Sequence, residues 1–93
     1  MGTVELTKHK QTLLDYLGSN YTKKIIDKEP CIYRDFGSYD IEISGGHKKR
    51  EKFYIYLWQK ERHLSVIEQI EIPNDFERVK YELDNLISKY NLT

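Results

Sequence analysis

Few side chains in this 93-residue sequence combine the type and the spacing that catalysis requires. Asp40 and Glu42 stand two positions apart, and on an extended strand that spacing puts both carboxylates on one face, about 6–7 Å apart. Such a pair suits general acid and base chemistry, but alternating acids are common on strands and do not identify an enzyme. No base stands near Ser44 or Cys31 in the sequence to activate a nucleophile. We therefore predict that the protein is not an enzyme.

The sequence shows no pattern typical of a metal or cofactor site. His9, His47 and His63 are widely separated and lack the close pairing of metal ligands, so each is expected at the surface. The single cysteine, Cys31, excludes an intrachain disulfide and is expected to be a small buried residue at the start of a strand. We predict that the protein uses no metal ion and no cofactor.

A glycine-rich, basic segment is the one candidate for binding phosphate. Gly45-Gly46 is followed closely by Lys48, Lys49 and Arg50. The segment lies between two predicted strands, whereas phosphate-binding loops lead from a strand into the N-terminus of a helix. We interpret it as a solvated hairpin loop, which leaves open a contact with an acidic partner or with a nucleic-acid backbone.

Composition predicts a folded domain without strong overall charge. Hydrophobic residues make up 39% of the chain and aromatic residues 13%, which argues against disorder. Fifteen basic residues balance fifteen acidic ones, a poor basis for affinity that comes from neutralising phosphates. No apolar run approaches the roughly 18 residues of a membrane span, and the N-terminus lacks the apolar core of a signal peptide. We expect one domain over residues 1–93, located in the cytoplasm and not bound to a membrane.

The clearest structural pattern is the alternation from Phe53 to Trp58. Successive side chains of a strand point to opposite faces, so two sets of residues separate there. One set is suited to burial against helices, namely Phe53, Ile55 and Leu57. The other set carries aromatic rings with polar atoms, a surface typical of binding sites, namely Tyr54, Tyr56 and Trp58.

Helices are predicted towards both ends of the chain. Leucines at helical spacing predict the first over Thr3–Leu17, with Gly18 as its stop. A capping box, with Asn74 in the cap position and Glu77 three residues later, predicts the start of the second. Its apolar residues follow at spacings of three and four: Phe76, Val79, Leu83, Leu86 and Tyr90.

The strands predicted between the helices are Cys31–Phe36, Tyr39–Ser44, Lys52–Trp58 and His63–Ile72, with a turn at Gln59–Arg62. Short connections between strands favour an antiparallel meander. The predicted fold class is α+β: an N-terminal helix, a three- to four-stranded antiparallel meander and a C-terminal helix, with the helices on one face of the sheet.

Two segments leave alternatives open. Residues 19–30 fit either a short second helix or an irregular strand, which Pro30 is expected to end. In the last strand, Glu68 interrupts a face formed by apolar residues at Leu64, Val66, Ile70 and Ile72. Either a bulge shifts the register near Glu68 or the carboxylate is paired inside the protein, and we favour the bulge.

The ringed face of the sheet is the candidate binding site. Its predicted neighbours on the adjacent strand are Asp40 and Glu42, placed beside Tyr54 and Tyr56. An RNA-stacking sheet pairs its rings with Lys or Arg, so acids beside the rings point to a protein partner. A terminal helix, residues 19–30 or a second copy of the chain could instead cover this face.

A segment of about a dozen residues resembles a known family. Tyr33–Ser44, with Asp35-Phe36-Gly37 at its centre, is similar to type II anti-CRISPR proteins of phages of low-GC Gram-positive bacteria. The long basic arm with which that family begins has no counterpart in this sequence, so its role is not carried over. The resemblance implies an inhibitor that blocks a Cas9-type nuclease.

We therefore expect a small protein-binding inhibitor from a phage or another mobile element. Its predicted contacts are the rings Tyr54, Tyr56 and Trp58, the acids Asp40 and Glu42, and the basic residues Lys48, Lys49 and Arg50. Large rigid rings suit this role because they bury much area while few torsions become fixed. The alternatives are a nucleic-acid accessory protein and a structural homodimer.

Overall fold

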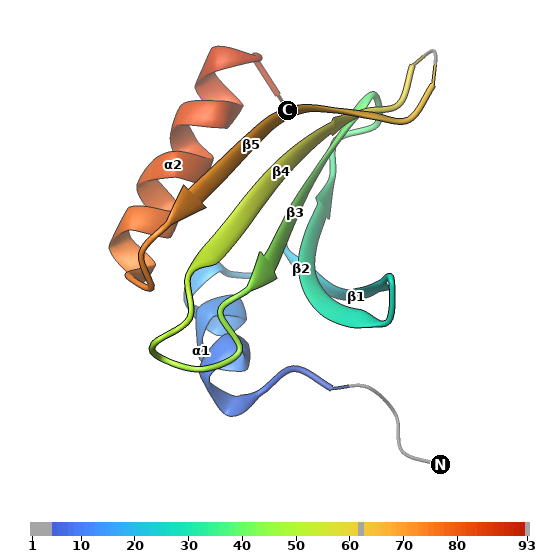
Figure 1. Ribbon diagram of the computed structural model, residues 1–93. Coiled ribbons are helices and arrows are strands. Elements are labelled where there is room, and N and C mark those ends of the chain that lie inside the picture. The colour runs from blue at the N-terminus through green and yellow to red at the C-terminus, as the bar shows by residue number, and fades with distance from the viewer. Residues whose placement is uncertain (1–4, 62, 93) are drawn as a thin grey trace.

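The sheet is an antiparallel meander whose five strands lie in chain order, β1-β2-β3-β4-β5 (Figure 1). The computed structural model describes residues 5–61 and 63–92. The strands are β1 (Thr22–Ile26), β2 (Glu29–Asp35), β3 (Tyr39–Gly45), β4 (Phe53–Gln59) and β5 (Ser65–Ile72), between the helices α1 (Lys8–Leu17) and α2 (Phe76–Lys89). The predicted α+β class is confirmed, with one strand more than the three to four expected.

Both helices cover one face of the sheet, as predicted (Figure 1). Phe53, Ile55 and Leu57 of β4 are completely buried on that face. They belong to one apolar cluster that includes Leu13 of α1 and three residues of α2: Val79, Leu83 and Leu86. Neither helix is long and apolar enough to cross a membrane, within the part of the chain that the structure describes. The other face of the sheet is left to the rings and acids of β3 and β4.

Residues 22–35 form a hairpin that the sequence did not specify. β1 is a regular strand that pairs with β2, and the two residues between them, Asp27 and Lys28, have φ values of 50° and 67°. Positive φ at both positions is the geometry of a tight turn that matches the strand twist. Pro30 does not end this segment, contrary to the prediction, because it is the second residue of β2 and pairs with Ile25. A missing N–H costs least near the beginning of a strand.

The predicted bulge lies in β5 and decides which of its residues face the core. Leu57 pairs with Glu68 but Trp58 pairs with Val66, so Ile67 is the extra residue. Beyond the bulge, Ile70 and Ile72 lie opposite residues of the buried set of β4. Before it, Val66 lies opposite Trp58, on the open face.

Glu68 itself is on the helix side of the sheet, where its carboxylate lies 2.9 Å from the ammonium of Lys89. The favoured alternative, the bulge, is therefore confirmed, whereas Glu68 pairs with a lysine whose side chain is 63% exposed and not inside the protein. A bulge that adds one residue reverses the side on which all preceding residues of the strand lie.

The helix ends differ in detail from the prediction. Asp75, not Asn74, caps α2, because its side chain accepts from the backbone N–H of Glu77 and Arg78. Asn74 instead donates to the carbonyls of Lys48 and Glu51, which ties the β3–β4 loop to α2.

Within the described residues, α1 begins at Lys8. Its cap is Thr7, whose side chain accepts from the N–H of Lys10, and Thr3 lies outside the described residues. Gly18 ends the helix at φ 97°, a left-handed conformation that only glycine adopts without strain. The predicted stop is confirmed.

Candidate functional site

The open face of the sheet is hollowed between the β1–β2 hairpin and the β4–β5 edge. Two adjoining hollows, of about 450 and 330 Å³, share Ile26, Asp27, Glu42 and Trp58. We call them together the concave groove. Its remaining lining residues are Lys24, Ile25, Glu29, Tyr33, Asp40, Ser44, Tyr56, Leu64 and Val66.

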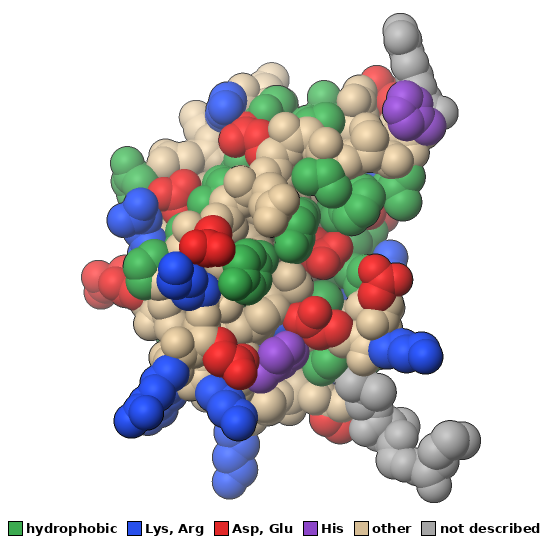
Figure 2. Space-filling model, in the orientation of Figure 1, with side chains coloured by type: hydrophobic (Ala, Val, Ile, Leu, Met, Phe, Trp, Pro, Cys, Tyr) green, Lys and Arg blue, Asp and Glu red, His purple; other side chains and the backbone are tan. Residues whose placement is uncertain are grey.

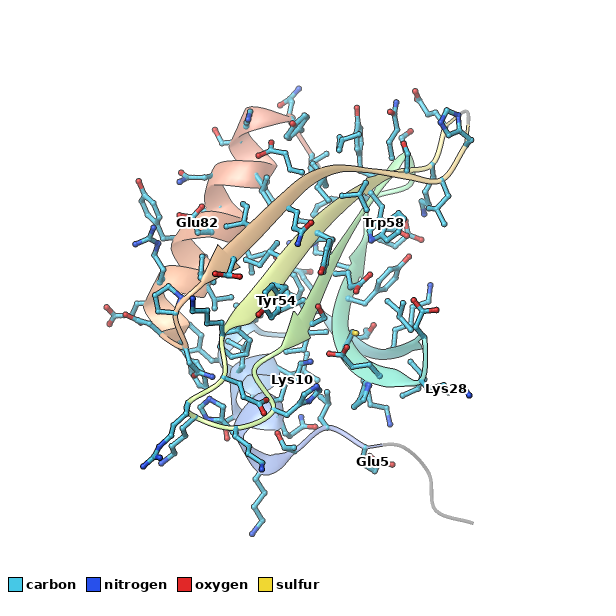
Figure 3. The ribbon with its side chains drawn as sticks, viewed as in Figure 1. Glu5, Lys10, Lys28, Tyr54, Trp58 and Glu82 are labelled. Carbon is cyan, nitrogen blue, oxygen red and sulfur yellow. The ribbon has the colours of Figure 1, made fainter. Side chains whose placement is uncertain are left out.

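Two of the three predicted rings and both predicted acids line the concave groove. Trp58 and Tyr56 lie in it with Asp40 and Glu42, whereas Tyr54 does not line it. Figure 3 shows Trp58 towards one end of the sheet and Tyr54 towards the end near Lys10. The aromatic face is therefore extended, and only its Trp58 end is concave.

The register pairs the acids with the rings, but two residues further along β4 than predicted. Asp40 lies opposite Trp58 and Glu42 opposite Tyr56, whereas Tyr54 lies opposite Ser44. The loop between the strands sets this register, and its length cannot be inferred from the alternation alone. The juxtaposition of acid and ring holds, although the individual pairs differ.

Asp40 has its counter-ion within the chain. The ammonium of Lys60 lies 2.7 Å from its carboxylate and 2.9 Å from that of Asp35. Hydrogen bonds from Lys60 to these acids raise the pKa of its ammonium, which therefore stays charged. The hydroxyl of Tyr33 donates to the other oxygen of Asp40, and burial together with this bond raises the pKa of Tyr33. The charge of Asp40 is thus compensated.

Glu42 is also buried, at 7% exposure, but it forms no direct ion pair within the described residues; the charge of Lys10 acts on it only from a distance. Trp58 Nε1 donates to Oε1 at 3.0 Å, and the Cys31 thiol lies 3.9 Å from Oε2. Burial raises the pKa of Cys31 to about 12, so the thiol is neutral. No Lys, Arg or His nitrogen of the described residues lies within 4 Å of the Glu42 carboxylate. Burial raises the pKa of Glu42, the expected result of desolvating a carboxylate.

Exposed apolar side chains surround these buried acids. Ile25, Val66 and Leu64 line the concave groove although they are 44%, 42% and 64% exposed. In Figure 2 hydrophobic and acidic side chains gather together on the right half of the face in view. Sequence analysis missed this rim, because it assigned Leu64 and Val66 to the same face as Ile70. The interruption at Glu68 was the available signal.

The predicted basic residues do not join the site. Lys48, Lys49 and Arg50 are exposed on the β3–β4 loop, which precedes Phe53, and none of them lines the concave groove. From Phe53 to Trp58 the strand extends about 16 Å. The predicted contacts therefore divide into an acidic, aromatic part and a separate basic loop.

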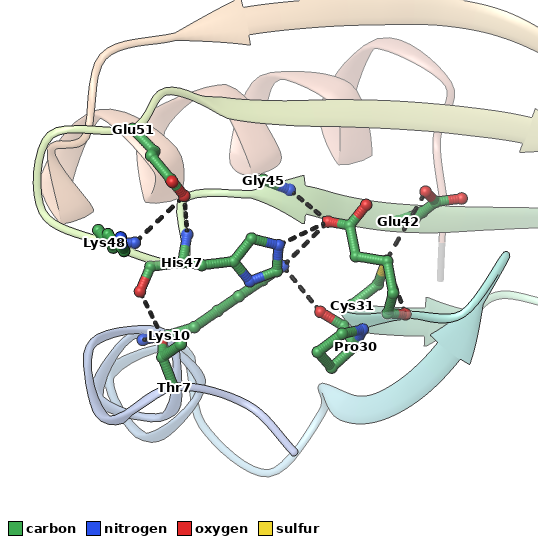
Figure 4. A network of polar contacts seen from close by, with 10 residues as sticks. Thr7, Lys10, Pro30, Cys31, Glu42, Gly45, His47, Lys48 and Glu51 are labelled. Carbon is green, nitrogen blue, oxygen red and sulfur yellow. Dashed lines mark hydrogen bonds and ion pairs between the residues drawn. The ribbon is translucent and has the colours of Figure 1, made fainter. Parts of the chain in front are cut away.

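A buried lysine that the sequence did not single out links α1 to β2 near the β3–β4 loop (Figure 4). Lys10 of α1 is completely buried, and its ammonium donates to the carbonyl of Pro30 at 2.9 Å. It also lies 3.7 Å from Glu29, which accepts from Gly45 N–H at 2.7 Å and lies 3.1 Å from His47 Nε2. Burial lowers the pKa of Lys10. The network fastens α1 to the sheet and to the β3–β4 loop.

No protein-family model, no curated protein and no solved structure matches this chain. Within residues 5–61 and 63–92, no group of three or more His, Cys, Asp or Glu side chains is arranged to hold a metal ion. The functional argument therefore depends on the geometry of the concave groove.

Proposed function

We propose that this protein acts by binding another protein through the concave groove, as a non-enzymatic inhibitor. The observation that carries the proposal is the combination of Trp58 with the exposed side chains of Ile25, Leu64 and Val66 along the concave groove. Apolar side chains gathered beside a ring that has a polar atom are typical of the centre of a protein interface. The buried acids at its floor supply the polar groups that fix orientation.

The specific target that we propose is a Cas9-type nuclease, and the support for it is the resemblance of Tyr33–Ser44 to type II anti-CRISPR proteins. This segment contributes Tyr33, Asp40, Glu42 and Ser44 to the concave groove. The residues that resemble the family thus belong to the surface that we propose as the contact. A protein of this kind would come from a phage or another mobile element.

The test is inhibition of DNA cleavage by a purified Cas9-type nuclease. We expect the wild-type chain to inhibit, and the double variant Tyr56→Ala, Trp58→Ala to lose inhibition. Removing central rings from an interface costs roughly 2 kcal/mol or more, which is about 30-fold in Kd. The matched control is Tyr81→Ala, because Tyr81 is 60% exposed on α2, away from the concave groove.

Two results would contradict the proposal in different ways. A wild-type chain that leaves cleavage unchanged would remove the nuclease as the target. A double variant that retains its secondary structure and inhibits as well as the wild type would show that the concave groove is not the contact.

A second candidate function is that of a nucleic-acid accessory protein. It is favoured by basic side chains around a hollow between α1, α2 and the β3–β4 loop. A third hollow, of about 560 Å³, is lined by Lys8, Lys49, His9, Thr12 and Phe76. Binding there to a single-stranded oligonucleotide would weaken steeply with salt. The rings of β4 face the acids instead of these lysines, which makes this the weaker proposal. The remaining alternative, a homodimer that buries its aromatic faces, would appear as a dimer in sedimentation at micromolar concentration.

A further inference from the structure

We propose that the concave groove recognises an arginine side chain of its protein partner, with the guanidinium stacked on the ring of Trp58 and donating to the carboxylate of Glu42. This inference rests on the proposed function and names the chemistry of the partner residue. Three properties of the groove carry it: a buried carboxylate that forms no direct ion pair within the described residues, an aromatic wall, and an apolar rim.

The charge of the groove is the first argument. Four carboxylates line it, those of Asp27, Glu29, Asp40 and Glu42, against one cationic side chain, Lys24. Asp40 is paired with Lys60 and Glu29 with Lys10. Glu42 is the buried acid that lacks such a pair in the described part of the chain. A buried carboxylate is costly unless a cation and hydrogen bonds satisfy it, so an incoming cation gains more here than at an exposed acid.

The aromatic wall is the second argument. The indole N–H of Trp58 is held by Glu42 Oε1 at 3.0 Å, which fixes the ring beside the carboxylate. Cations are attracted to the faces of aromatic rings, and tryptophan is the strongest of these partners. The groove already contains one such contact, because Lys24 Nζ lies 4.1 Å from the centre of the Tyr33 ring.

The shape and the rim select arginine over a compact ammonium. A guanidinium is flat and weakly hydrated, so it stacks on a ring while donating in its plane to a carboxylate. The aliphatic stem and apolar neighbours of the arginine would contact Ile25, Leu64 and Val66. The larger hollow, of about 450 Å³, is within the size range of ligand sites, about 300–1,000 Å³.

The experiment uses three blocked pentapeptides on the wild-type chain: Ac-Gly-Leu-Arg-Leu-Gly-NH₂ and its analogues with citrulline or glutamate in place of arginine. Citrulline keeps the shape of arginine but removes its charge. Trp58 is the single tryptophan of the sequence, so its indole N–H gives one assignable resonance in a nitrogen–proton NMR spectrum. We expect the arginine peptide to shift this resonance saturably, and the citrulline peptide to bind at least fivefold more weakly.

Two variants test whether the affinity depends on Glu42 itself or only on the total negative charge of this face. Glu42→Gln keeps a carbonyl that can accept from Trp58, and we expect it to reduce the affinity for the arginine peptide to that for citrulline. Glu71→Gln is the matched control. Glu71 is opposite Tyr54 on the same face, paired with Lys52 and outside the concave groove, so its loss should leave the affinity unchanged.

Each remaining outcome overturns the inference. Equal responses to arginine and citrulline would show that charge is not recognised, and this comparison needs no variant to fold. A preference for the glutamate peptide would show that the groove binds an acidic side chain and not a basic one. No response to any of the peptides would refute arginine recognition, while the inhibition assay with Tyr56→Ala, Trp58→Ala would still decide the proposed function separately.

Discussion

At the scale of single residues, two buried acids that stand two positions apart have different environments. Asp40 has an ammonium within the chain, whereas Glu42 has a neutral indole N–H and a neutral thiol. Both residues are acids at alternate positions of one strand. The sequence could therefore predict that they share a face, but not that their partners differ. The difference arises because Lys60, just beyond β4, returns to Asp40 and Asp35.

The burial of Glu42 without a direct ion pair in the described residues leads to a prediction about stability. Burial raises the pKa of Glu42 in the folded chain above its ordinary value of 4.5. At pH values between 4.5 and this raised pKa, the folded chain therefore holds more protons than the unfolded chain. The free energy of unfolding therefore falls as the pH rises through that window, and the full cost remains at neutral pH. The Glu42→Gln variant cannot titrate there and should be more stable than the wild type at pH 7.

Thermal unfolding followed by circular dichroism at pH 7 and near pH 4 measures this effect. We expect a higher midpoint for Glu42→Gln at pH 7 and a smaller difference near pH 4, where each kcal/mol corresponds to about 4–8 °C in a domain of this size. A variant that is less stable than the wild type at pH 7 would contradict the argument. Higher stability together with lost arginine binding would mark Glu42 as a residue retained for function.

At the scale of elements, regular alternation made most of the fold predictable. β2, β3 and β4 begin and end within two residues of their predicted positions, since each alternates or contains a clear apolar run. β1 was left open between a short helix and an irregular strand because four of its five residues are exposed, so burial imposes no pattern on them. The turn at Asp27 and Lys28 likewise lacks the Gly or Asn that would reveal positive φ.

The bulge in β5 shows how one extra residue determines both the core and the binding site. Val66 and Ile70 would share a face in an uninterrupted strand, but Ile67 separates them. Ile70 packs against the core, whereas Val66 is 42% exposed at the concave groove. Sequence predicted the bulge from Glu68, yet it could not state which residues moved to the open face.

Replacing each of these two residues by threonine tests the bulge. Val66→Thr should change the free energy of unfolding by no more than about 0.5 kcal/mol, as is usual for an exposed site. Ile70→Thr should destabilise by roughly 1–3 kcal/mol, because it removes apolar contacts and places a hydroxyl against the core. Urea unfolding of both variants gives the comparison. Equal losses at the two positions would mean that the strand continues without a bulge.

At the scale of the whole molecule, the concave groove is locally acidic and the β3–β4 loop locally basic, although the chain is neutral overall. The acids lie at the floor of the concave groove, whereas several Lys and Arg side chains project at the lower left of Figure 2. Thr7 and Asn74 hold the basic loop by hydrogen bonds to the carbonyls of His47 and of Lys48 and Glu51. Composition showed the balance of charge, but only the fold shows that the basic loop and the acidic groove lie in different places.

The distance between the basic loop and Trp58 predicts that this loop does not contribute to arginine recognition. The triple variant Lys48→Ala, Lys49→Ala, Arg50→Ala should bind the arginine peptide within about twofold of the wild type. The loop and Trp58 lie at opposite ends of β4, about 16 Å apart, which exceeds the screening length of about 8 Å at physiological salt.

The Trp58 indole resonance measures the peptide affinity of the triple variant, and Glu42→Gln in the same titration is the variant expected to lose it. A single-stranded oligonucleotide titrated against the same proteins gives the converse comparison, because any phosphate binding should decrease in the triple variant and persist in Glu42→Gln. If the triple variant lost the arginine peptide, the loop and the concave groove would be one contact surface, as the sequence alone predicts. If the peptide binds normally, the protein carries two independent surfaces of opposite charge.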